Sequence, residues 1–214
     1  MITLHYYPGN ASMTPHLLLR ELGRPFELQL VDRTRNAQQS AAYLKLNPNG
    51  LIPVLQDGDL VLYETAAILL HLVDTQPEAG LAPAVGTAER AEFYKWLLWL
   101  SNTVQAMMPH YFYSERMVAP GNAAGAAEVK AQAEAKIAAA MDQIDARLAA
   151  TGAWMGGARF SALDPYAFML CRWTRGMQRP ARTRPHIAPF LERMLARPAT
   201  QAVIAAEALP APWV

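Results

Sequence analysis

The sequence has a single cysteine, Cys171, so a disulfide bond within one chain is excluded. Its histidines are scattered at positions 5, 16, 71, 110 and 186, and none has metal-ligand spacing relative to another or to the cysteine. No apolar run approaches the roughly 20 residues that a membrane-spanning helix needs. The N-terminus also lacks the basic and apolar regions of a signal peptide. These absences predict a cytoplasmic protein without a structural metal.

The chain also lacks an excess of charge of either sign, because 19 basic and 18 acidic side chains leave a formal net charge of +1. No overall field therefore attracts nucleic acid or an anionic membrane. One basic cluster is present, which we interpret as a solvent-exposed helix end and loop. It consists of Arg175, Arg179, Arg182 and Arg184. Apolar residues are abundant, at 52%, enough for a buried core in one large or two small domains.

The first residues show a strand pattern followed by a helix pattern. The stretch ITLHYY predicts a strand. Thr14 as N-cap and Pro15 at the first helical position predict a helix that Gly23 ends. Phe26–Val31 alternates apolar and polar side chains and predicts a second strand. Two strands joined by a helix of this length predict a right-handed parallel crossover.

A helix, a hairpin and a last helix complete this part of the chain. A second helix is expected over about residues 38–46, and the proline-containing turn Asn47–Gly50 ends it. Two short strand patterns flank Asp57-Gly58, a dipeptide suited to a tight hairpin turn. A helix from Glu64 onward closes a small βαβαββα unit.

The pattern changes after this unit. Thr75–Thr87 is rich in proline, glycine and alanine and has no apolar period, which predicts a linker between domains over residues 1–76 and 87–214. Apolar residues then recur every three or four positions in two long stretches, which predicts helices. Ser161 and Asp164 resemble a capping box and predict a third helix, followed by two shorter ones. The predicted fold class is therefore α/β plus all-α.

Three segments of the first domain are placed to bind a ligand, because ligands bind beyond the carboxyl ends of strands and helix N-termini offer free N–H groups. They are PGNASMT, NGLIPV and YET. In the second segment, the backbone at Ile52-Pro53 suits an extended peptide ligand, with a cis bond before the proline. In the third, Glu64 suits an ammonium group and Thr65 suits a carboxylate, so an α-amino acid group fits the pair.

Together these features resemble the cytosolic glutathione transferases. The stretch YYPGNASMTPHLLLRELG is most similar to the bacterial beta class, and NPNGLIPVL and FSALDPYAF match further family patterns. The resemblance covers nearly the whole chain. It implies a thioredoxin-like first domain that binds glutathione, a helical second domain that supplies most of the electrophile pocket, and usually a homodimer.

The resemblance also implies roles for individual residues. Backbone groups of Ile52 pair with the cysteinyl part of glutathione, with Pro53 cis and Leu51 beside them as a further contact. Glu64 and Thr65 hold the γ-glutamyl end.

The departures from the beta class limit what the resemblance implies. Ala11 stands where that class has a cysteine, so no mixed disulfide with glutathione forms there. Gln105 aligns with a histidine of that class; it donates hydrogen bonds but is neither an acid nor a base. Asn36 replaces a basic residue, and we expect the neighbouring Arg35, or Arg33, to take a carboxylate of glutathione.

Two hydroxyl groups compete to favour the thiolate of glutathione over the thiol. Ser12 lies at the start of a helix and resembles the serine or cysteine position of other classes, whereas Tyr6 aligns with the tyrosine of still others. We favour Ser12, because helix N–H groups point to the same place. The structural alternatives are a plain N-terminal cap for Ser12 and a buried aromatic for Tyr6. Asn10 is expected to join the hydrogen-bond network.

The segment from Gln105 to Met117 is the candidate second-substrate pocket, because thioethers and aromatics suit irregular apolar ligands. Met108, Tyr111 and Tyr113 are the predicted lining residues, although an aromatic-rich helix is also typical of a core. Trp173 either closes this pocket or belongs to the core.

The predicted function is conjugation of the glutathione thiolate to apolar electrophiles. Two alternatives remain open at this point. One is a non-catalytic binding protein of the same fold, and the other is a glutathione-dependent isomerase or thioether-cleaving enzyme.

Overall fold

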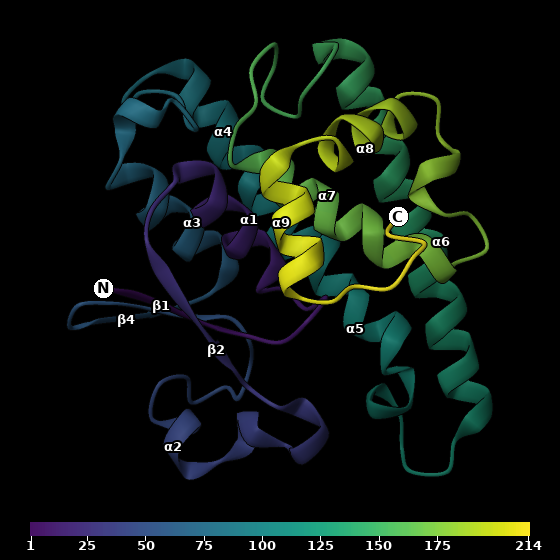
Figure 1. Ribbon diagram of the computed structural model, residues 1–214. Helices are drawn as coiled ribbons and strands as arrows, with labels where there is room; N and C mark the ends of the chain where they lie inside the picture. The colour runs from purple at the N-terminus through teal and green to yellow at the C-terminus, as the bar shows by residue number, and fades with distance from the viewer.

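The computed structural model describes residues 1–214 and begins with a four-stranded sheet (Figure 1). Its order is β2-β1-β3-β4. The strands are β1 (Ile2–Tyr6), β2 (Phe26–Leu30), β3 (Val54–Asp57) and β4 (Leu60–Tyr63). β1 and β2 are parallel, with Ile2 opposite Phe26, and this confirms the predicted crossover. β3 runs antiparallel to both neighbours.

The helices of this part differ in detail from the prediction. They are α1 (Met13–Leu22), α2 (Ala41–Leu44) and α3 (Thr65–Asp74). α1 begins before the predicted cap, with Ser12 at the N-cap position, and ends at Gly23 as predicted, where φ is 65°. The predicted helix over about 38–46 is present but shorter, because Ser40 is extended and its hydroxyl accepts the N–H of Tyr43, so α2 is a single turn.

The predicted hairpin is present but shifted by one residue. Asp57 pairs with Leu60, which leaves Gly58 and Asp59 as the turn. Gly58 has φ 61°, a left-handed conformation that glycine adopts without strain.

Everything after α3 is helical, as predicted for this part of the chain. The α-helices are α4 (Ala88–Trp99), α5 (Ala106–Phe112), α6 (Ala123–Thr151), α7 (Leu163–Trp173), α8 (Ile187–Leu195) and α9 (Pro198–Ala206). A π-helical segment, Leu100–Gln105, joins α4 to α5. One half of the predicted capping box is present: Asp164 accepts the N–H of Ser161 at 2.7 Å and its hydroxyl at 3.1 Å, whereas the N–H of Asp164 donates to the carbonyl oxygen of Ser161 and not to its hydroxyl. None of these helices combines the length and apolar composition of a membrane span.

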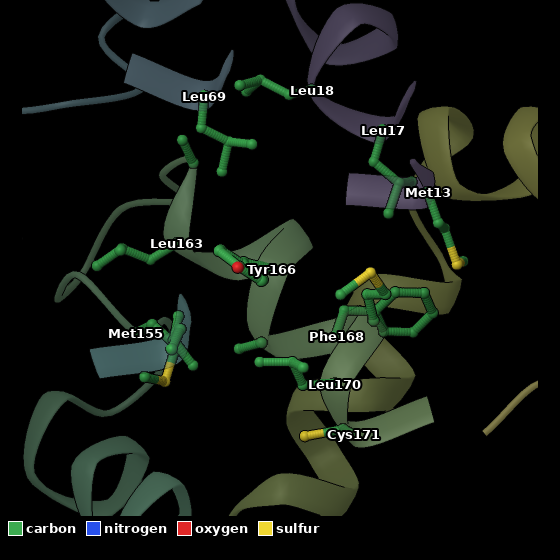
Figure 2. Close-up of a cluster of buried hydrophobic side chains, with 14 of the residues drawn as sticks. Met13, Leu17, Leu18, Leu69, Met155, Leu163, Tyr166, Phe168, Leu170 and Cys171 are labelled. Atoms are coloured by element: carbon green, nitrogen blue, oxygen red, sulfur yellow. The ribbon is translucent and has the colours of Figure 1, made fainter. Parts of the chain in front are cut away.

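A single hydrophobic core joins the sheet to the helices. It contains 42 buried apolar residues drawn from both parts of the chain, so the two parts are packed as one body. α1 packs against α3, α7 and α9 (Figure 1). Figure 2 shows Met13 and Leu17 of α1 in the same cluster as Phe168 and Leu170 of α7. The boundary between domains at residues 76 and 87 stays a prediction.

α7 is the most deeply buried helix, since every residue from Leu163 to Arg172 is buried. Cys171 lies within it, 2% exposed, and burial raises the pKa of its thiol to about 12, so it is an inert core residue as predicted (Figure 2). The interpretation of the basic cluster as solvent-exposed is wrong for Arg184. That side chain is buried and donates to Asp142 and to the carbonyl oxygen of Ala138.

Candidate functional site

A cavity of about 700 Å³ lies between the sheet-containing part and the helical part. From the first part it is lined by Gly9, Asn10, Ala11, Arg33, Gln38, Gln39, Gly50, Leu51, Ile52 and Glu64. From the second it is lined by Ser101, Asn102, Gln105, Ala106, Met108, Pro109, Phe112, Tyr113, Arg116, Met117, Trp173 and Arg175.

Most of the predicted site residues meet at this cavity. Those in its wall are Asn10, Leu51, Ile52, Glu64, Gln105, Met108, Tyr113 and Trp173. The predicted residues outside its wall are Tyr6, Ser12, Arg35, Pro53, Thr65 and Tyr111. A second cavity, of about 770 Å³, lies between the linker, α4 and the segment before α7, and no predicted site residue lines it.

The segment leading into α1 presents backbone and amide donors. Asn10 Oδ1 accepts the N–H of Ala11 at 2.6 Å, which leaves the amide NH₂ of Asn10 free to donate into the cavity. The N–H of Ser12, at the N-cap of α1, has no acceptor within the protein. Free N–H groups at a helix N-terminus attract an anion.

Neither predicted hydroxyl activator faces the cavity. Ser12 is fully buried, and its Oγ accepts the N–H of Tyr7 and donates to the carbonyl oxygen of Tyr7, both at 3.2 Å. The Tyr6 ring packs edge-on against His16, with 6.4 Å between ring centroids, and contacts the core. Ser12 makes no capping bond with its side chain, so the alternative of a plain N-terminal cap does not describe it either, and Tyr6 is a half-buried strand aromatic.

Groups from the last helices hold the segment at Gly9 in place. Glu207 Oε2 accepts the N–H of Gly9 at 2.8 Å, and the indole Nε1–H of Trp173 donates to the carbonyl oxygen of Gly9 at 2.9 Å. Glu207 Oε1 also lies 2.8 Å from Nδ1 of His16, and both side chains are fully buried. Gly9 has φ 67°, so a side chain at this position would add backbone strain.

The backbone before β3 is presented as predicted. The Ile52-Pro53 bond is cis, and neither the N–H nor the carbonyl of Ile52 has a hydrogen-bond partner in the protein. The carbonyl oxygen of Leu51 accepts from Tyr43 and from Asn47, at 2.9 and 2.8 Å, which fixes this loop. The free groups of Ile52 are therefore able to pair with an extended peptide ligand. Pro53 is itself buried behind the wall.

Glu64, at the N-cap of α3, has a free carboxylate. Its side chain makes no capping bond and no ion pair, and it lies in the cavity wall. The residue has φ 73°, an uncommon conformation for a side chain other than glycine, and such strain is concentrated at functional sites. Thr65, by contrast, is 4% exposed and its hydroxyl is below the wall, so only Glu64 of the pair reaches the cavity directly.

The helical wall begins with the π-helical segment, which presents Ser101, Asn102 and Gln105. The buried hydroxyl of Tyr166 donates to Oε1 of Gln105, which leaves the NH₂ of Gln105 to donate elsewhere. Burial raises the pKa of Tyr166, so its hydroxyl stays protonated. π-helical turns are frequent at functional sites.

The aromatic part of the wall differs from the prediction by one residue. Phe112, and not Tyr111, lines the cavity; its ring meets that of Trp173 at 90°, with 6.4 Å between centroids. Tyr111 lies toward α6, where the ammonium group of Lys130 sits 5.0 Å from its ring centroid. The π-helical segment adds a residue to the turn before α5, which changes the face on which later side chains fall.

The cavity wall is rich in arginine. Arg33, Arg116 and Arg175 line it, and Glu64 is its one acidic residue. The guanidinium of Arg33 donates to the hydroxyl of Tyr113 at 2.9 Å. Arg35 is 86% exposed and lies 3.8 Å from Asp32, and of the two arginines considered for a carboxylate contact only Arg33 lines the cavity. Arg116 and Arg175 were not predicted as site residues, although the sequence showed a basic cluster that contains Arg175.

The chain is similar to known proteins along nearly its whole length. Residues 11–75 match the family model described as "Glutathione S-transferase, N-terminal domain". The chain is 30% identical to glutathione S-transferase GST-4.5 of Xanthomonas campestris pv. campestris, over 96% of this chain and 98% of that protein. Two solved structures are also similar. A sphingomonad glutathione S-transferase complexed with glutathione is 30% identical, with a TM-score of 0.83 and coverage of 97% and 100%. A bacterial beta class glutathione S-transferase from Sphingomonas chungbukensis is 28% identical, with the same TM-score and coverage.

Proposed function

Because this chain belongs to the glutathione S-transferase family and is a glutathione transferase, we propose that its cavity binds glutathione and brings the thiolate to an electrophile held by the helical wall. The observation behind this proposal is that Glu64, Ile52 and Asn10, with its free amide NH₂, line the same cavity.

Glutathione binds in an extended conformation along the first part of the chain. Its ammonium group forms an ion pair with the free carboxylate of Glu64. Its γ-glutamyl carboxylate accepts hydrogen bonds from the backbone N–H groups at the start of α3, beside Thr65. The cysteinyl unit pairs with the backbone of Ile52. The glycine carboxylate forms an ion pair with the guanidinium of Arg33, which lies in the wall and has no carboxylate partner in the protein.

The thiolate lies at the start of α1. A free thiol has a pKa of about 8.5, so only about 3% is ionised at pH 7, and hydrogen bonds to the charged form raise that fraction. We assign this role to the amide NH₂ of Asn10 and the N–H of Ser12, because the hydroxyl of Ser12 is already bonded to Tyr7. Ala11 has no thiol, so the reaction does not pass through a mixed disulfide with this segment.

The electrophile packs on Met108, Phe112 and Trp173. In a substitution, the sulfur forms a bond to the electrophilic carbon and the leaving group departs with its electron pair, while the thiol proton has already passed to solvent. Holding both reactants in one cavity makes the step effectively unimolecular.

The active molecule is a homodimer. Leu60 and Val61 of β4 and Leu98 of α4 are large apolar side chains that remain exposed in the single chain, at 41%, 39% and 50%. Exposed apolar residues of this kind are buried when subunits associate. Light scattering that gave the mass of a single chain at working concentrations would contradict the dimer.

Calorimetric titration with glutathione tests the proposal. Two buffers of different ionisation enthalpy, near neutral pH, separate binding from proton release, and we expect binding with release of a proton. A conjugation assay on a neutral chloronitrobenzene follows under the same conditions. Binding without proton release, together with no conjugation above the uncatalysed rate, would favour the non-catalytic alternative.

A further inference from the structure

We propose that the second substrate carries an anionic group, a carboxylate or its equivalent on a flat aromatic or conjugated electrophile, which Arg116 and Arg175 recognise. This inference rests on the proposed function and narrows its substrate class. Apolar electrophiles were predicted from the sequence, and the charges of the cavity wall argue for one that also carries a negative charge.

The two arginines have no strong carboxylate partner in the protein. Arg175 forms no ion pair, and its Nη1 donates only to the carbonyl oxygen of Arg172. Arg116 lies 3.8 Å from Glu115, and both side chains are mostly exposed, at 69% and 66%, so this pair contributes little. A positive potential therefore remains at this end of the cavity. Burial, and after it the charge of Arg175, lowers the pKa of the neighbouring Arg172 to about 10.

Glutathione does not account for these charges. In the proposed binding mode its ammonium group uses Glu64, its glycine carboxylate uses Arg33, and its thiolate uses Asn10 and the start of α1. Arg116 and Arg175 come instead from the segments after α5 and α7, on the helical side that holds the electrophile. A guanidinium binds a carboxylate through paired N–H donors and so fixes its orientation.

The aromatic residues next to these arginines define the rest of the ligand. The guanidinium of Arg116 lies 4.5 Å from the ring centroid of Tyr113, and Trp173 is two residues before Arg175. Phe112 and Trp173 meet edge to face in the wall of the same cavity. A flat ligand that stacks on these rings places a ring substituent within reach of the cations at the rim.

A matched pair of electrophiles tests the inference. The probes are 4-chloro-3,5-dinitrobenzoate and its methyl ester, which undergo the same reaction. Sulfur forms the bond to the ring carbon, chloride leaves with the bonding electrons, and the thiol proton goes to buffer. Each kcat/KM is divided by the uncatalysed rate constant with glutathione, which removes the greater intrinsic reactivity of the ester. We expect the wild type to favour the carboxylate by about tenfold in this ratio.

The variants locate the effect. In the double variant Arg116→Gln/Arg175→Gln the preference is expected to fall to about one, because the carboxylate loses its guanidinium partners. Arg159→Gln is the matched control, because Arg159 lines the second cavity and not this one. Higher ionic strength should reduce the preference of the wild type and leave that of the double variant unchanged. Calorimetric glutathione binding verifies that each variant retains the first subsite.

Each outcome has one meaning. An equal or lower normalised rate for the carboxylate in the wild type, or an unchanged preference in the double variant, would overturn the inference while conjugation of the ester upholds the transferase function. Failure to conjugate either probe despite glutathione binding would overturn the proposed reaction, and the inference with it.

Discussion

The carboxylate of Glu207, at the end of α9, accepts the backbone N–H of Gly9 at 2.8 Å across 198 positions of sequence. Its other oxygen lies 2.8 Å from Nδ1 of His16, and the side chain is fully buried. The last helix thus holds the segment that leads into α1, where we propose that the thiolate lies. A residue remote from the cavity in sequence therefore controls the placement of the donors in its wall.

Replacing Glu207 by alanine should destabilise the fold by about 3 kcal/mol, because it leaves Gly9 N–H and a ring nitrogen of His16 unpaired in the core. Urea unfolding measures this change. Glu192→Ala on the exposed face of α8 is the matched control and should change stability by less than about 0.5 kcal/mol. Equal effects of the two substitutions would show that the Glu207 contacts do not stabilise the structure.

Glu64→Ala should weaken glutathione binding by about tenfold or more, because the ligand ammonium group loses its carboxylate partner. Little change in stability is expected, since the side chain makes no bond in the free protein. Calorimetric titration gives the dissociation constant. Asp59→Ala, at the exposed β3–β4 turn, removes the same charge away from the cavity, and a similar loss in that variant would refute a specific role for Glu64.

Asn10→Ala should raise the pKa of bound glutathione by about one unit and slow conjugation at neutral pH, because the thiolate loses a hydrogen-bond donor. The ultraviolet absorbance of the thiolate, followed against pH, reports this pKa. Ser12→Ala should instead lower stability by about 1–2 kcal/mol, since its bonds to the Tyr7 backbone are lost, and leave the thiol pKa unchanged. If Ser12→Ala raised the thiol pKa as much as Asn10→Ala, the role would return to the serine hydroxyl.

The buried carboxyl of Asp164 should make stability depend on pH. Burial raises its pKa from 3.8 to about 7, although the N–H groups of Met155 and Ser161 oppose the shift. The folded state therefore binds this proton more tightly than the unfolded state. The contribution of the Asp164 carboxyl to the free energy of unfolding is greatest below about pH 4 and is lost as pH rises to about 7. Urea unfolding of the wild type and Asp164→Asn across this window isolates the effect. The wild-type advantage should shrink as pH rises, and a growing advantage would refute the raised pKa.

Residues at the ends of secondary-structure elements were predictable from the sequence. Glu64 and Ile52 follow directly from their places before α3 and β3, because strand ends and helix N-termini determine which groups remain free. The bond from Ser161 N–H to Asp164 was predictable for the same reason, since it is local.

Some predicted site residues lie outside the cavity because of local bonds, a helix irregularity and distant packing that sequence patterns do not show. A serine at a helix start is free to bond forward or backward, and Ser12 bonds back to Tyr7. Phe112 lines the cavity in place of the predicted Tyr111 because a π-helical segment precedes both residues. The apolar pattern of that stretch does not predict a π-helical segment. Arg175 reaches the cavity only through the turn after α7, which brings it beside segments far away in sequence.

Because one core is shared by the sheet-containing part and the helical part, the two parts of this chain cannot be exchanged independently. A chimera that joined residues 1–76 to a foreign helical partner would keep Glu64 and Ile52, the residues that we propose bind the tripeptide. It would lose the hydrogen bonds of Trp173 and Glu207 with the backbone of Gly9, unless the foreign helical part had equivalent residues. An exchange of the helical part of this chain would therefore also have to preserve the bonds that fix the segment before α1.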